Sequence, residues 1–145
     1  MTVTTPGREQ LRTAFVEESA AVLPNVDWIV RGNALVFPAV SPSLGTLEVV
    51  FDGGEITISF GHRGYHQHHT PDDELSAAAL EQSIRDTARD AAVFVAALTN
   101  DQIVFRWGLL ISGTFANRPP GIVRRIWRGL TPWVREAVWS GGRVD

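Results

Sequence analysis

The side chains best suited to chemistry are four histidines in one short segment, and the chain has no others. The segment, residues 61–69, reads Gly-His-Arg-Gly-Tyr-His-Gln-His-His, and three acids follow at residues 72–74. Imidazole is the commonest metal ligand among side chains and the one that normally titrates near neutral pH. A metal site or a contact surface is therefore expected here before anywhere else in the chain.

The spacing of the histidines selects which of them could share an ion. His66 and His68 project from the same face if the backbone is extended. With one of the following acids they would form the His/His/carboxylate set of catalytic zinc and non-haem iron sites. Gly61 and Gly64 favour a loop, so a polar segment without any cofactor is the leading expectation. The alternative is a metal set of His66, His68 and Asp72 that holds zinc or another divalent metal.

Composition bounds the class of protein. The 145 residues suit one domain, and 44% hydrophobic and 20% charged residues are typical of a soluble globular chain. Cysteine is absent, which excludes disulfides, thiolate nucleophiles and cysteine-based zinc sites. The first residues lack a secretory signal, and no window has the apolar length of a membrane span. We expect a cytoplasmic protein without a membrane partner.

Charge is distributed unevenly along the chain. Residues 1–105 contain 6 Arg and 14 acids, whereas residues 106–145 contain 7 Arg and 2 acids. This asymmetry can mark a binding surface, but the fold can equally bring the two parts together so that they neutralise each other. Arg124, Arg125 and Arg128 beside Trp127 could contact a nucleic acid. The sequence pI of about 5.8 argues against that partner.

The first half of the chain predicts one helix followed by strands. Thr5-Pro6 is a typical helix start, and an apolar stripe with helical spacing continues to Leu23. Alternating residues then predict strands at 26–31 and 34–37, joined by a turn at Gly32-Asn33. The clearest hairpin joins residues 47–51 to residues 56–60 through Asp52-Gly53-Gly54. Ile56, Ile58 and Phe60 should face the core.

The second half predicts a long helix and further strands. Thr70-Pro71 is a second helix start, and a buried stripe through Leu80, Ile84, Ala88, Ala91, Val95 and Leu98 would end it near Leu98. Strands are expected at 103–107, 109–115 and 133–139, with a turn or bulge at Gly108 and a short amphipathic helix at 122–130. We expect one α+β domain over residues 1–145, with a mainly antiparallel sheet covered by one long helix and an additional N-terminal helix.

The predicted helix start directly after the histidines has an electrostatic consequence. The positive end of a helix favours anions and lowers the affinity of nearby imidazoles for protons. The histidine segment is therefore expected to form a contact or ligand site beside that end.

Two short motifs resemble a set of small bacterial proteins. The first is Glu-Ile-Thr-Ile-Ser-Phe-Gly at residues 55–61 followed by His66-x-His68, and the second is Trp-Ser-Gly at 139–141 ahead of Asp145. The resemblance is to immunity-type proteins found near polymorphic-toxin loci, and it covers most of the chain from about residue 46. Here His69 stands where an aromatic residue is usual, and an Arg-rich segment precedes the last strand. The resemblance implies a binding protein rather than an enzyme.

The expected function is the binding of another protein, in the particular form of a toxin-neutralising immunity-type protein. The acidic portion would then cover a basic active site of the toxin through charge complementarity. The candidate contact residues are His62, Tyr65, His66, His68 and His69. The alternative function is a small metal-dependent enzyme or metal sensor built on the same histidines, and no reaction is assigned from the sequence.

Overall fold

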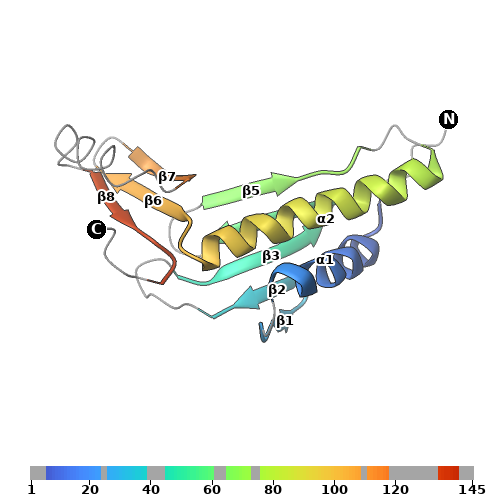
Figure 1. The fold of residues 1–145 in the computed structure, drawn as a ribbon, viewed down its shortest axis with the longest axis horizontal. Coiled ribbons are helices and arrows are strands. Elements are labelled where there is room, and N and C mark those ends of the chain that lie inside the picture. The colour runs from blue at the N-terminus through green and yellow to red at the C-terminus, as the bar shows by residue number, and fades with distance from the viewer. Residues whose placement is uncertain are drawn as a thin grey trace.

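The computed structural model describes residues 6–23, 26–38, 45–60, 65–72, 76–108, 111–117 and 134–140. These form an α+β fold with two helices and two antiparallel sheets (Figure 1). The predicted fold class is confirmed. The described elements are α1 (Arg8–Val22), β1 (Ile29–Arg31), β2 (Ala34–Phe37), β3 (Leu47–Asp52), β4 (Glu55–Phe60), β5 (Tyr65–His69), α2 (Ala77–Thr99), β6 (Ile103–Gly108), β7 (Ile111–Asn117) and β8 (Val134–Ala137).

The main sheet has five strands in sequence order, β1-β2-β3-β4-β5, so each strand pairs with its neighbours along the chain. The hairpin of β3 and β4 turns at Gly53-Gly54, where both φ angles are positive, at 53° and 84°. Glycine adopts this backbone conformation at no steric cost, as the predicted tight turn requires. Ile56 and Ile58 are fully buried, whereas Thr57 between them and Glu55 before them are not. The side chain of Phe60 lies outside the described part.

Both helices pack on the same sheet: α1 contacts β3 and β4, and α2 contacts β4 and β5 (Figure 1). On α2, the predicted stripe is buried in full, from Leu80 to Leu98. On α1, Leu11 and Phe15 are fully buried, and the Phe15 ring packs on Phe51 with centroids 5.7 Å apart. Most buried residues of both helices and of the sheet belong to one core. Ala34 and Val36 on β2 are buried as well but are not part of it.

The predicted start of the first helix is wrong by about two residues. The helix begins at Arg8 with Gly7 as its N-cap in an extended conformation. The Gly7 N–H donates to the side-chain oxygen of Gln10 over 2.9 Å, which satisfies a backbone group that Thr5-Pro6 was expected to serve. The predicted end is confirmed, since the helix stops at Val22.

The predicted start of the long helix is also wrong. Thr70 and Pro71 are not helical, and α2 begins only at Ala77 after Ser76. Pro71 is buried, and the backbone N–H of Asp72 donates to the Ser83 hydroxyl over 2.8 Å. Residues 70–72 therefore run alongside the second turn of α2 instead of beginning the helix.

The smaller sheet has the order β7-β6-β8, so the last strand pairs with β6 rather than with β7. The register shifts between Arg106 and Gly108, as expected for a bulge at that glycine. Arg106 donates to Glu136 on β8 over 2.8 Å, and both side chains are largely buried. The predicted helix at 122–130 lies outside the described residues. Within the described part, no helix is both long enough and apolar enough to span a membrane.

The alternation on β4 gives a test of which face is buried. Ile58→Ala should lower the free energy of unfolding by about 2–5 kcal/mol, because it removes a fully buried side chain and leaves a cavity. Ser59→Ala, one residue further along the opposite face, is the matched control and should cost less than about 1 kcal/mol. Urea unfolding measures both, and equal losses would contradict the assignment of the two faces.

Candidate functional site

The histidine segment forms a strand, and this distributes its side chains over two faces. Residues 65–69 make up β5, which pairs with β4 and is the edge of the main sheet among the described strands. His66 and His68 are exposed, whereas Tyr65 is 4% exposed and His69 is half-buried. Side chains alternate along a strand, so the segment presents two histidines outward and one toward the helices. His62 lies outside the described residues.

Tyr65 is a core residue and not the surface contact that was expected. Its hydroxyl donates to the backbone carbonyl of Arg106 over 3.1 Å, and its ring packs on Phe105 with centroids 5.3 Å apart. Both partners belong to β6, so Tyr65 joins the main sheet to the smaller one. A side chain in this position cannot meet a partner without disturbing the core.

A polar cluster occupies the face of the sheet opposite the helices. Thr57 on β4 lies directly opposite His68 on β5 in the pairing register. Its hydroxyl donates to the Glu55 carboxylate over 2.9 Å and lies 3.2 Å from His68 Nδ1, which is itself 3.1 Å from that carboxylate. The rings of His66 and His68 lie edge to face with centroids 5.0 Å apart. We call Glu55, Thr57, His66 and His68 the outer-face cluster.

The geometry of this cluster excludes one form of catalysis. In a nucleophile–histidine–carboxylate triad, the carboxylate and the hydroxyl engage opposite nitrogens of the imidazole. Here Thr57 and Glu55 both approach Nδ1 of His68, so the hydroxyl cannot pass its proton through the ring. The carboxylate instead orients the imidazole. Glu55 and Thr57 therefore hold the His68 side chain in place at the surface.

The predicted metal set is only partly brought together. His66 and His68 lie side by side, but Asp72 follows the end of β5 and its backbone is bonded to Ser83 on α2. In the part of the chain that the structure describes, no three His, Asp or Glu side chains form a group that could hold a metal ion. Among the described residues, Glu55 is a carboxylate in contact with His68, and sequence spacing did not single it out.

His69 lies on the helix side of the sheet. It pairs with Ile56 in the register, and its ring is 6.0 Å from the ring of Phe94 on α2. Its Nε2 atom is buried and has no hydrogen-bond partner. Burial lowers the pKa of His69 below its ordinary value of 6.5, opposed by the charge of Asp90 and assisted by His68.

The helix start that was expected directly after the histidines lies further along the chain. The seven residues 70–76 separate β5 from the first residue of α2, and His69 lies beside Phe94, in the second half of that helix. Loss of hydration on burial is the main cause that lowers the pKa of His69.

The residues that sequence reasoning missed are Glu55 and Thr57. A signal for them was present, because they are the polar positions of an alternating strand next to the histidines. Antiparallel pairing places polar positions of neighbouring strands on one face. The missing information was the register, which sets Thr57 opposite His68.

Comparison of the chain with models of protein families, with curated proteins and with solved structures gives no match. The resemblance to immunity-type proteins therefore stays a prediction from two short motifs, and the function must be argued from the geometry.

The lowered pKa of His69 predicts a dependence of stability on pH. The unfolded chain binds this proton near pH 6.5, above the pKa of the folded state. The contribution of neutral His69 to the free energy of unfolding is therefore fully present above pH 6.5. It is lost as the pH falls through the pKa of the folded state. His69→Phe and His69→Gln both remove the titrating group, so each should make the urea midpoint fall less steeply below pH 6.5. Only His69→Phe keeps a ring against Phe94, which separates the effect of titration from that of packing. A decline as steep as in the unchanged protein would show that His69 is not its source.

Proposed function

We propose that this protein acts by binding another protein, and that the outer-face cluster is part of the contact surface. The observation that carries the proposal is the pair of exposed imidazoles, His66 and His68, on the edge strand of a sheet whose other face is covered by helices. Edge strands and exposed polar faces are where proteins add a partner strand or dock a partner surface.

The chemistry of the cluster supports recognition rather than catalysis. The Glu55 carboxylate and the Thr57 hydroxyl restrain His68 before any partner arrives, so less side-chain freedom is lost on binding. An imidazole ring offers both apolar contact area and a hydrogen-bonding nitrogen. Two such rings 5.0 Å apart make a compact anchor for a partner.

The particular form proposed is a cytoplasmic immunity-type protein that neutralises a toxin. It is supported by the two motifs that resemble such proteins and by the 14 acids among residues 1–105 against 6 Arg. An acidic surface steers association with a basic partner and suppresses association with the wrong ones.

A second candidate is a metal-dependent enzyme or metal sensor using His66 and His68 with zinc or another divalent metal. One observation favours it: the Glu55 carboxylate contacts Nδ1 of His68, as carboxylates commonly do behind a metal-bound histidine. Two histidines leave several coordination positions to water or to a partner, which makes this candidate the weaker one.

The two candidates differ in what His66→Ala/His68→Ala does to the isolated protein. Under the protein-binding function, untagged protein contains no stoichiometric metal, and the double substitution leaves the melting temperature nearly unchanged. The exposed His68–Glu55 contact contributes little to stability. Elemental analysis and calorimetry measure both properties. Stoichiometric zinc, iron or nickel that is lost with a fall in melting temperature would establish the metal candidate instead.

The partner itself is the second test. The tagged protein and its double variant are used to capture proteins from the native host, and the captured partner is then purified and titrated by calorimetry. We expect His66→Ala/His68→Ala to weaken the affinity by about tenfold or more, the range of residues that anchor an interface. Val93→Ala, on the exposed side of α2, is the control. Equal affinity for the double variant would remove the cluster from the interface, and a partner that is harmless when expressed alone would exclude the immunity role.

A further inference from the structure

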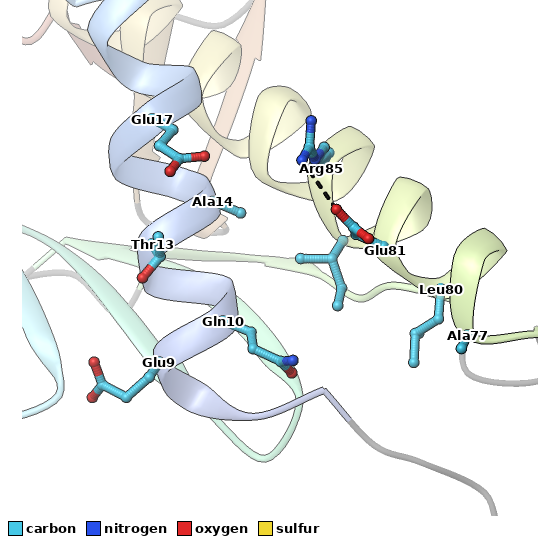
Figure 2. Close-up of a pocket in the computed structure, with 10 residues that line it drawn as sticks. Glu9, Gln10, Thr13, Ala14, Glu17, Ala77, Leu80, Glu81 and Arg85 are labelled. Carbon is cyan, nitrogen blue, oxygen red and sulfur yellow. Dashed lines mark hydrogen bonds and ion pairs between the residues drawn. The ribbon is translucent and has the colours of Figure 1, made fainter.

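A groove lies on the helix side of the molecule, between the first turns of α2 and the first three turns of α1. Its volume is about 640 Å³ (Figure 2). The apolar residues Ala14 of α1 and Leu80 and Ile84 of α2 line it, and each is less than a tenth exposed, so only the edges of these core side chains face the groove. Three carboxylates border it, those of Glu9, Glu17 and Glu81.

The groove has a structural cause in the way the two helices meet. Arg89 on α2 donates to both carboxylate oxygens of Glu18 on α1, over 3.0 and 3.4 Å. Among the described residues, no other ion pair joins the two helices. On the side of this contact toward both helix starts, short side chains such as Ala14 on α1 and Ala77 on α2 border the space between the helices (Figure 2). A groove remains because these side chains cannot fill the space.

The charge of the groove is negative. Glu81 is paired with Arg85 over 3.0 Å, which leaves its charge largely balanced. Glu9 and Glu17 are exposed, and neither forms an ion pair within the described part of the chain. The starts of both helices add a positive potential, equivalent to about half a charge each. The two negative charges of Glu9 and Glu17 are larger than the combined positive charge of the two helix starts. The helix dipole also acts mainly within the first turn, and Glu17 lies beyond the first turn of α1.

We propose that this groove binds a segment of a partner protein in which an apolar side chain is flanked by arginine or lysine. The apolar side chain would cover Leu80, Ile84 and Ala14, and the basic side chains would reach Glu9 and Glu17. A segment with this pattern gains from burying apolar area, at roughly 25 cal/mol per Å², and from charge complementarity at the rim. The proposal rests on the proposed protein-binding function and adds the chemistry of the partner, but it does not depend on the outer-face cluster.

Two pairs of substitutions test the groove with matched controls. Thr13→Trp fills it without changing its charge, and Val16→Trp adds the same ring to an exposed position of α1 that does not line it. Glu17→Arg reverses a rim charge, and Asp27→Arg reverses the charge of an exposed acid elsewhere. The probe is a short fluorescent peptide with leucines at helical spacing and arginines between them, compared with a peptide carrying glutamate in place of each arginine.

We expect the arginine peptide to bind the full chain in a fluorescence anisotropy titration and the glutamate peptide not to bind. Thr13→Trp and Glu17→Arg should each weaken the affinity by about tenfold or more, and the two controls should leave it unchanged. Binding should also weaken with added salt, since rim charges are screened at a Debye length of about 3 Å in 1 M salt.

Several outcomes overturn the proposal. These are the absence of peptide binding, equal binding of both peptides, or equal affinity in Thr13→Trp and Val16→Trp. Sedimentation of the free protein addresses another occupant: self-association that Thr13→Trp abolishes would assign the groove to a second copy of this chain. A captured partner that still binds Thr13→Trp would refute the groove while leaving the protein-binding function intact.

Discussion

The packing of Tyr65 determines how the whole histidine strand is oriented. Its ring fills the core against Phe105, and its hydroxyl bonds to the backbone of β6, so it can face only inward. A strand that slips by one residue moves every side chain to the other face. Burying Tyr65 therefore forces His66 and His68 outward and His69 toward the helices. The outer-face cluster exists because of a residue that takes no part in it.

The same constraint gives His69 a different character from its neighbours. It occupies a core-side position between Ile56 and Phe94, where its Nε2 atom is buried without a partner. An apolar aromatic side chain would suit this position better, because a buried polar atom without a hydrogen bond costs about 1–3 kcal/mol. One segment thus places His66 and His68 on the outer face and His69 on the helix side, where burial lowers its pKa.

Much of the fold follows from local patterns in the sequence. The hairpin at Gly53-Gly54, the buried stripe of α2 and the end of α1 depend on residues close together in the chain, and all were predicted correctly. The two helix starts were not, because Thr-Pro is also compatible with an extended segment, and the choice depended on distant groups such as the Ser83 hydroxyl. For the site, alternation predicted the common face of His66 and His68. Their carboxylate neighbour could not be predicted, because Glu55 is close to His68 only through the pairing register of β4 and β5.

The side chains that form the core and the side chains proposed for recognition are largely different residues. The main core lies largely between the sheet and the helices, where residues such as Phe15, Phe51 and Ile58 are fully buried. The outer-face cluster and the rim of the groove instead consist of exposed or half-buried side chains, which usually change stability by less than about 0.5 kcal/mol when replaced. Under the proposed binding function, substitutions on the two surfaces would alter recognition while the fold is retained.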